Sequence, residues 1–270
     1  MTLQTTAPAT RTRWTAEGGP IAGERILAEE TPVALAHDGS TTAVMMATPG
    51  DLEDFGLGFS LSEGVVQSAD EIRDLEVEVS DLGVEVRMWL TPDRTRDLAA
   101  RRRHMAGPTG CGLCGVESLA AAARPLRPVP DEAFKVSSAD LLAAMAALEG
   151  AQSMGRLTRA VHAAGLWRRT APLLLREDVG RHNALDKLIG ATARQSGGPG
   201  GGAGGVLLLT SRVSVEMVQK AATLGAPIVC AVSAPTALAV RTAEAAGLTL
   251  VGVTRADGFE VFTHPGRVAL

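Results

Sequence analysis

Residues 206–253 read VLLLTSRVSVEMVQKAATLGAPIVCAVSAPTALAVRTAEAAGLTLVGV. Short apolar runs typical of buried strands alternate in this segment with helical patterns that end at a glycine. We expect strands at 206–210, 228–232 and 248–253, and helices at 215–224 and 236–246. Continuous apolar strands that alternate with amphipathic helices indicate an α/β fold, with a mostly parallel sheet and helices on both of its faces.

The preceding residues extend this pattern towards the N-terminus. Leu173–Leu175 is an apolar run typical of a buried strand, and a helix is expected near Ala184–Ile189. The glycine-rich segment 195–205 is expected to be a surface loop. Three prolines within 124–130 favour an extended connector, after which Ser137 is expected to cap a helix. We therefore expect a C-terminal α/β domain over residues 131–270.

The first half of the chain predicts a smaller domain of mixed α and β structure over residues 19–130. A short strand is expected near 29–36. Thr48-Pro49 is expected to begin a helix, with Thr48 as its cap. Alternating apolar residues at 75–79 and 84–90 flank a glycine-containing turn, so they predict a hairpin with one buried face.

The composition excludes several classes of function. The chain has 270 residues, of which 46% are hydrophobic, so it can bury a sizeable core, and its formal net charge of -4 gives no basic footprint for nucleic acid. The longest apolar runs are too short to span a membrane. Residues 1–14 lack the apolar region of a secretory signal. We therefore expect a cytoplasmic protein whose residues 1–18 form a disordered tail.

A cysteine pair between glycines is the sharpest local feature, since residues 109–115 read TGCGLCG. Three cysteines are too few for a disulfide scaffold, and in a reducing compartment a close pair is usually catalytic or metal-binding. The glycines can leave the sulfurs of Cys111 and Cys114 uncovered. Cationic groups in Arg101–His104 favour the reactive thiolate. A thiolate can take sulfur from a donor's persulfide, and a second cysteine can assist its release.

From its spacing alone, this pair has four interpretations. A structural zinc site needs four ligands, but Cys230 lies in an apolar run and the histidines are not at finger-like spacing, so no bound metal is expected. A thioredoxin-like pair would lie early in a βαβ unit, whereas this pair follows an Arg-rich segment after a hairpin. Sulfur transfer fits the pattern better, and a pair without chemical function is the remaining interpretation.

Polar residues follow each expected strand of the second half. These connections are Arg176–Lys187, Arg212–Lys220, Ser233–Thr236 and Thr254–Gly258. Because the carboxyl ends of parallel strands meet at one edge of a sheet, they predict a crevice suited to an anionic, nucleotide-like ligand. For the first connection, a charged helix start with an exposed Glu177–Arg181 pair is an equally good interpretation. None of the four matches a P-loop or a dinucleotide-binding fingerprint.

Several segments of the chain occur together, in this order, in one known family. The longest is EDVGRHNALDK at 177–187. The others are Thr48-Pro49 with Asp51–Phe55, Gly58-Phe59 through Glu63-Gly64, Cys111–Gly115, His162–Ala164, Ser214 with Glu216-Met217 and Lys220–Ala222, and Ser233–Thr236 with Leu238–Val240. On these segments the chain resembles the formate dehydrogenase accessory sulfurtransferase family, FdhD. The resemblance runs from about Glu30 to the C-terminus.

The resemblance implies a sulfurtransferase. Such proteins accept persulfide sulfur from a cysteine desulfurase and pass it to the molybdenum bis(molybdopterin guanine dinucleotide) cofactor, bound as a client, which formate dehydrogenase requires. Cys111 maps to the persulfide carrier, with Cys114 as its partner. The cofactor, of which GDP is a fragment, is expected to bind at Val253, Thr254, Arg255, Ala256, Asp257 and Gly258, with His182, Asn183 and Arg212 as further candidates at the same edge. A core similar to the cytidine deaminase fold and a homodimer are also implied.

Some positions depart from the family pattern. Arg159-Ala160 stands where the family usually has two glycines, and Ser211 stands where a glycine is common. Val253 and Gly258 stand where the last loop usually carries Phe and a second Arg. These departures leave open a role for His162 and the details of guanine recognition. The rival function is a chaperone that binds the cofactor without sulfur chemistry, which would leave the cysteine pair unexplained.

Overall fold

The computed structural model describes residues 3–105, 126, 128–129, 133–196 and 200–270, and for residues 101–105 it describes the backbone alone. Cys111 and Cys114 lie outside the described residues, as does the predicted domain boundary at residue 130. The described chain contains a six-stranded sheet, a four-stranded sheet and two small two-stranded sheets.

The six-stranded sheet forms the centre of the second half, in the order β13-β12-β11-β10-β8-β9. Its strands are β8 (His162–Arg168), β9 (Ala171–Asp178), β10 (Val206–Leu209), β11 (Ile228–Ala231), β12 (Thr249–Arg255) and β13 (Gly258–Val261). The strands predicted at 206–210, 228–232 and 248–253 are confirmed as β10, β11 and β12, which pair in parallel.

The prediction of a mostly parallel sheet is wrong on both sides of these strands. β8 pairs antiparallel with β9 and with β10, and β13 pairs antiparallel with β12. The connections β8–β9 and β12–β13 are far too short for a crossover, so each pair closes as a hairpin and the sheet is mixed. Because β9 and β10 both run antiparallel to β8, β9 still points in the same direction as β10, β11 and β12.

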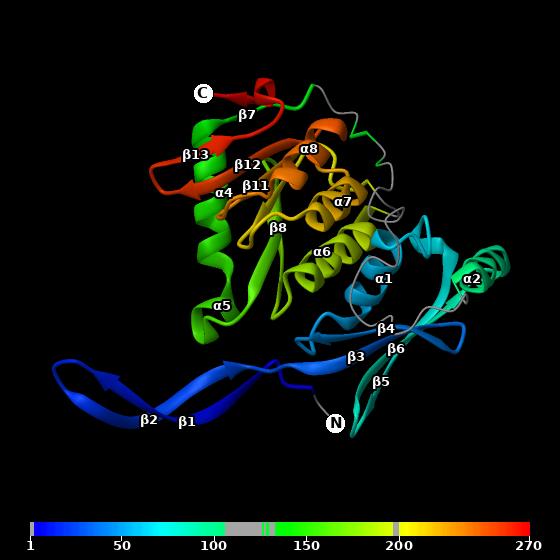
Figure 1. Cartoon of the computed structure of the whole chain (residues 1–270), viewed down its shortest axis with the longest axis horizontal. Coiled ribbons are helices and arrows are strands. Elements are labelled where there is room, and N and C mark those ends of the chain that lie inside the picture. The colour runs from blue at the N-terminus through cyan, green and yellow to red at the C-terminus, as the bar shows by residue number, and fades with distance from the viewer. Residues whose placement is uncertain (1–2, 106–125, 127, 130–132, 197–199) are drawn as a thin grey trace.

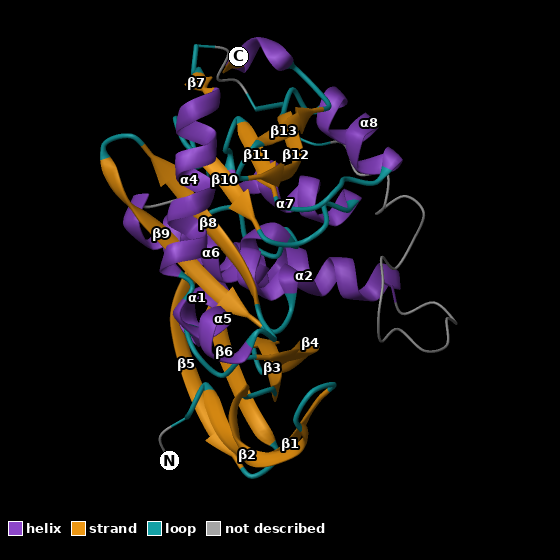
Figure 2. Ribbon diagram, turned by 90° about the vertical axis from the view of Figure 1, so that its left-hand side faces the viewer, coloured by secondary structure: helices purple, strands orange, loops and turns teal. Residues whose placement is uncertain are grey.

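Helices cover both faces of this sheet, as the sequence predicts. On one face lie α6 (Arg181–Ser196), α7 (Val215–Leu224) and α8 (Ala237–Ala245), and on the other lies α4 (Ser138–Ala151) (Figure 1, Figure 2). Leu207 and Leu209 join the buried cluster under the first three helices, whereas Leu208 joins the cluster under α4. Ser137 caps α4 as predicted, by accepting a hydrogen bond from Asp140 N (3.0 Å). The similarity of this core to the cytidine deaminase fold stays a prediction.

The first half of the chain builds the four-stranded sheet, in the order β4-β3-β6-β5. Its elements are β3 (Thr31–His37), β4 (Ser40–Ala47), α1 (Leu52–Ser62), β5 (Ile72–Ser80), β6 (Gly83–Leu90) and α2 (Pro92–Met105). The predicted strand near 29–36 and the β5–β6 hairpin are confirmed. α1 buries Phe55 against Val33, Val86 and Met88 of the sheet.

Thr48 does not cap α1, contrary to the prediction. The cap position is Asp51, at φ 52°, and its side chain makes no capping hydrogen bond. Thr48 Oγ1 instead accepts from Val179 N (3.2 Å), a partner far away in the sequence. Tertiary contacts have therefore overridden a local capping preference.

α1 and α6 lie side by side between the two larger sheets (Figure 1). Each helix approaches the other's backbone at a glycine. A Cβ at Gly58 would lie 1.7 Å from Asp186 O, and a Cβ at Gly190 would lie 1.9 Å from Asp54 O. The two glycines therefore set the distance between the two halves of the described chain.

Gly58→Ala is expected to lower the free energy of unfolding by about 1–3 kcal/mol or more, because the added methyl group collides with the backbone of α6. Gly150→Ala in α4 is the matched control, since nothing lies within 4 Å of its added methyl group. Alanine's helix preference should make that control neutral or stabilising by up to ~1 kcal/mol. Denaturant unfolding measures both variants, and equal effects would contradict the close approach of α1 and α6.

Residues 3–18, the described part of the predicted disordered tail, instead lie mostly in a strand. β1 (Thr6–Thr15) pairs antiparallel with β2 (Gly19–Ala28), and this hairpin projects from the rest of the chain (Figure 1). Arg25 Nη2 donates to Thr158 O (3.0 Å) in α5 (Ser153–Thr158). Most of the hairpin is exposed on both faces, so it lacks the apolar alternation by which a strand is usually recognised. The second two-stranded sheet pairs β7 (Val136–Ser137) with β14 (Val268–Ala269).

Candidate functional site

The carboxyl ends of β9, β10, β11 and β12 meet at one edge of the six-stranded sheet. Thr236 N donates to Val213 O (3.0 Å), and Val253 N donates to Ser233 O (3.4 Å), so the loops after β10, β11 and β12 are joined to one another. We call residues 178–183, 210–216, 232–236 and 253–258 the strand-end edge. The structure thus brings part of each of the four predicted polar connections to this edge.

The predicted cofactor loop begins with a strained residue. Val253 has a φ of 53°, which costs a β-branched residue on the order of 1–3 kcal/mol, and the β12–β13 register shifts at this point. Thr254 is buried, and its Oγ1 lies 3.3 Å from Cys230 Sγ. Cys230 is itself fully buried, which confirms the sequence interpretation of this cysteine as a core residue.

The remainder of the cofactor loop is open to solvent. The exposed members of the candidate set are Arg212, Arg255, Ala256 and Asp257. The Arg255 guanidinium donates to the carbonyl oxygens of Thr254 (2.8 Å) and Val232, which hold it against the end of β11. Gly258 starts β13. Two guanidinium groups are therefore accessible at this part of the edge.

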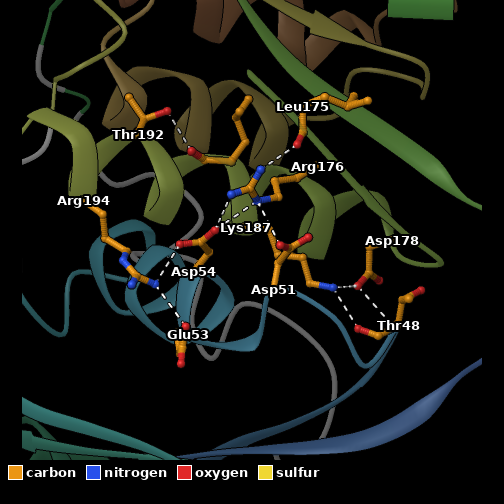
Figure 3. A network of polar contacts seen from close by, with 11 residues as sticks. Thr48, Asp51, Glu53, Asp54, Leu175, Arg176, Asp178, Lys187, Thr192 and Arg194 are labelled. Atoms are coloured by element: carbon orange, nitrogen blue, oxygen red, sulfur yellow. Dashed lines mark hydrogen bonds and ion pairs between the residues drawn. The ribbon is translucent and has the colours of Figure 1, made fainter. Parts of the chain in front are cut away.

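A fully buried ion pair links the first polar connection to the segment before α1. Lys187 Nζ lies 2.6 Å from Asp178 Oδ2, and neither side chain is exposed. Lys187 also donates to Thr48 O (2.8 Å), and Thr48 N donates to Asp178 Oδ2 (3.1 Å) (Figure 3). Asn183 Nδ2 donates to Asp178 Oδ1 (3.0 Å) and Met46 O (2.8 Å). Asn183, a predicted ligand-binding residue, therefore already has structural partners.

Figure 3 shows a second group of ion pairs beside this one, centred on Asp54 of α1. Arg176 Nη2 of β9 lies 2.6 Å from Asp54 Oδ2, and Arg194 Nη1 of α6 lies 3.3 Å from Asp54 Oδ1. Arg194 also contacts Glu53 (3.2 Å) and is half-exposed. Arg176 thus belongs to the α1 contact and is not available at the strand-end edge.

Lys220 of α7 forms another buried pair, with Asp186 of α6. Its Nζ lies 2.9 Å and 3.0 Å from the two Asp186 oxygens, and it also donates to Ser62 Oγ (2.8 Å) and Glu63 Oε1 (2.9 Å). Burial raises the pKa of Asp186. Burial also opposes the charge of Lys220, but Asp186 and Glu63 outweigh it and raise the pKa of the amine. The contacts of Nζ are those of an ion pair that holds α1, α6 and α7 together.

Glu177 and Arg181, both described, do not form the exposed pair that the sequence offered as an alternative. The Glu177 carboxylate is buried and accepts from Met154 N (3.0 Å) and Gly155 N (2.7 Å) at the start of α5. It therefore satisfies backbone donors at the N-terminus of a short helix.

Within Arg176–Lys187, the side chains of Arg181 and His182 have no role in holding the described part of the fold together. Among the described residues, no hydrogen bond or ion pair involves either side chain, and Arg181 Nε and His182 Nε2 are buried. Burial and the charges of Arg181 and Lys220 lower the pKa of His182 to about 4, against the influence of Glu216 and Glu63, so the imidazole is neutral at pH 7. Buried polar atoms without partners call for an explanation such as a ligand.

The comparisons with known proteins agree with one another. A family model described as the FdhD/NarQ family matches residues 28–269. The chain belongs to this family. The sulfur carrier protein FdhD of Agrobacterium fabrum is 50% identical over 260 residues, which cover 94% of this chain and 93% of that protein. A protein of the same name from Brucella abortus is 51% identical over 250 residues, or 90% of each chain.

A solved structure supports the same assignment to the FdhD/NarQ family. It is the crystal structure of a formate dehydrogenase accessory protein from Desulfotalea psychrophila, which matches with a TM-score of 0.75 at 26% identity. The match covers 98% of this chain and 100% of that one. The mixed α/β fold is therefore that of an FdhD-type protein, and the resemblance stated from the sequence is confirmed.

Two further features of the FdhD/NarQ chain concern metals and membranes. Within the described ranges, no group of three or more His, Cys, Asp or Glu side chains is arranged to hold a metal ion. Because Cys111 and Cys114 lie outside those ranges, the absence of a bound metal stays a prediction. None of the described helices is long and apolar enough to cross a membrane.

Proposed function

We propose that this FdhD/NarQ protein is a sulfurtransferase that carries sulfur as a cysteine persulfide. The proposal rests on Cys230, the cysteine outside the close pair, because its thiol is buried. The chain has three cysteines, and burial raises the pKa of Cys230 to about 11. A covered thiol that is neutral at pH 7 cannot attack a donor. Relatives of 50% and 51% identity are named sulfur carrier proteins, so Cys111 and Cys114 remain as the carriers.

The proposed donor is a cysteine desulfurase that bears a persulfide. The Cys111 thiolate attacks the outer sulfur of that persulfide, the donor's S–S bond breaks, and the donor cysteine leaves as a thiolate. Cys111 then carries the sulfur as its own persulfide. For release, the Cys114 thiolate attacks the inner sulfur, and the outer sulfur leaves as hydrosulfide. Two cellular thiols, or one dithiol, then reduce the resulting Cys111–Cys114 disulfide and are themselves oxidised to a disulfide before the next cycle.

The proposed acceptor is the molybdenum bis(molybdopterin guanine dinucleotide) cofactor of formate dehydrogenase, which is the substrate of this transfer. Its nucleotide portions carry phosphate groups, and the strand-end edge offers the exposed guanidinium groups of Arg212 and Arg255. Arginine suits such groups because it makes charge-assisted, bidentate contacts to phosphate. The unpaired Arg181 and His182 add further donors at the same edge. These residues would bind and orient the cofactor, whose molybdenum accepts the sulfur.

Arg255→Ala is expected to weaken the binding of GDP, used as a cofactor fragment, by tenfold or more. The loss of one charge-assisted contact costs on the order of 1.5–3 kcal/mol. Arg169→Ala is the control, because Arg169 lies between β8 and β9 at the opposite edge of the sheet. Titration calorimetry compares the two variants with the unchanged protein. If Arg255→Ala binds GDP as tightly as the control does, the nucleotide site must lie elsewhere, and the segment Asp178–Lys187 is the next candidate.

The competing proposal is a chaperone that binds the cofactor and transfers no sulfur. It accounts for the strand-end edge equally well but gives Cys111 and Cys114 no part. Incubation with a desulfurase and cysteine separates the two proposals, because only a sulfur carrier gains a sulfur atom on Cys111. The homodimer and the cytoplasmic location also stay predictions.

A further inference from the structure

His162 joins Arg181 and His182 in a cluster at the strand-end edge. It is the first residue of β8 and pairs in register with Asp178, the last residue of β9. Burial and the charge of Arg181 lower the pKa of His162, against the influence of Asp178. The same guanidinium lowers the pKa of His182. Arg181, in α6, therefore lies close enough to influence an imidazole of β8 as well as its neighbour in α6.

The charged groups around this cluster leave Arg181 without a partner. Lys220 is held by Asp186 and Glu63, so its charge is compensated. Glu216, at the start of α7, also faces Arg181 and His182, and its interaction with Ser214 is the main cause of its lowered pKa. Glu216 nevertheless forms no ion pair with Arg181, although both residues are described. An unpaired guanidinium therefore lies beside two largely neutral imidazoles.

We propose that Arg181, His162 and His182 form a subsite for one phosphate-sized oxyanion. Arg181 Nε–H and one ring N–H of each imidazole are donors, and an oxyanion offers several acceptors to receive them. Such an anion also supplies the missing counter-charge. The charge of Arg181 would repel a cation, and an apolar ligand would leave Arg181 Nε and His182 Nε2 unsatisfied.

The assignment of this anion to one phosphate group of a guanine nucleotide rests on the proposed function. Binding of inorganic phosphate does not rest on it, since the donors and the charge belong to this chain. The protein could therefore bind phosphate at this subsite without transferring sulfur. It could also transfer sulfur without binding phosphate there.

NMR titration of the histidine ring protons in the full-length purified protein tests the subsite. The pKa of His182 is measured in sodium phosphate and in sodium chloride of equal ionic strength, so that general screening is the same in both. A bound oxyanion stabilises the imidazolium form, so phosphate is expected to raise this pKa from about 4 by roughly one unit. One unit corresponds to about tenfold tighter binding of phosphate to the protonated form. The pKa of His162 should rise in parallel.

Arg181→Gln should remove most of this phosphate-dependent shift, whereas Arg194→Gln, at the far end of α6, should leave it unchanged. His264 serves as an internal reference, because it lies against Glu244 and away from the cluster. If phosphate leaves the pKa of both His162 and His182 unchanged in the native protein, the subsite does not exist. An undiminished shift in Arg181→Gln would also overturn the inference. Should that variant not fold, the native titration decides alone.

Two further ligands identify the source of the anion. GDP carries phosphate groups on a nucleoside, and guanosine is the same nucleoside without them. GDP is expected to raise the pKa of His182, whereas guanosine is expected to leave it unchanged. A shift with GDP but none with inorganic phosphate would mean that the whole nucleotide is needed, and it would overturn a subsite for a lone phosphate-sized oxyanion. An equal shift with guanosine would show that the anion is not the cause and would overturn the proposal.

Discussion

Cells that depend on this chain for formate dehydrogenase activity are expected to lose that activity when Cys111 is changed to Ala. The thiolate is the nucleophile that takes sulfur from the donor, and no other side chain replaces it. Alanine lacks only the sulfur atom of cysteine, so the variant is expected to fold. Formate-dependent dye reduction in cell extracts measures the effect.

Cys230→Ala is the matched control for this substitution. It removes a thiol of the same intrinsic chemistry, but one that is buried in β11 and has a raised pKa. We expect this control to retain most of the activity, with a modest loss of stability from the smaller core side chain. Full activity of Cys111→Ala, with the protein present at normal levels, would refute the proposed sulfur transfer.

Lys187→Met is expected to lower the free energy of unfolding by about 3–5 kcal/mol. The substitution leaves the buried carboxylate of Asp178 without its counter-charge, and removal of one partner from a buried ion pair is strongly destabilising. It also removes one of the two donors to Thr48 O, which keeps only its hydrogen bond from Gly50 N (2.8 Å). A loss of this size is a large part of the 5–15 kcal/mol that typically holds a protein folded.

Arg194→Met on the same helix provides the comparison for Lys187→Met. Arg194 is half-exposed, and its ion pairs with Glu53 and Asp54 are screened by water, so its loss should cost less than about 1 kcal/mol. Urea denaturation, followed by circular dichroism, measures both variants. If the two variants lose similar amounts of unfolding free energy, the Lys187–Asp178 pair contributes no more to stability than a surface ion pair does.

The core of the second half could be predicted because its signals are local and redundant. β10, β11 and β12 are continuous apolar runs, and α7 begins and ends at the predicted residues. The strand directions at the sides of the sheet could not be predicted so simply. They depend on the turn at 169–170, which carries no glycine, and on the turn at 256–257, where Asp257-Gly258 was interpreted as part of a ligand-binding loop and not as a hairpin.

The N-terminal hairpin and the role of Thr48 escaped prediction for different reasons. β1 and β2 are exposed on both faces, so no apolar alternation marks them as strands. Thr48 has the right residue type and position for a helix cap, but it is taken up by Val179 and Lys187, which are more than a hundred residues away. Single-sequence patterns cannot report contacts over such separations.

In the candidate site, too, the sequence could not report contacts between distant residues. The sequence marked residues 176–187 as a dense polar cluster but could not sort its members by role. The structure assigns Asp178, Asn183 and Lys187 to a buried network, and Arg181 and His182 to the group without partners. This sorting depends on the position of α1, which packs on α6 through Gly58 and Gly190. Only the three-dimensional arrangement separates residues that support the fold from those free to bind a ligand.

Mass spectrometry of this protein after incubation with a cysteine desulfurase and cysteine tests sulfur transfer most directly. No Lys or Arg separates Cys111 from Cys114, so trypsin leaves both on one peptide and fragmentation must locate the modification. We predict the added mass of one sulfur atom on Cys111, none on Cys230, and none on that peptide in Cys111→Ala. If the desulfurase is active but neither Cys111 nor Cys114 gains sulfur, this chain is not a persulfide carrier.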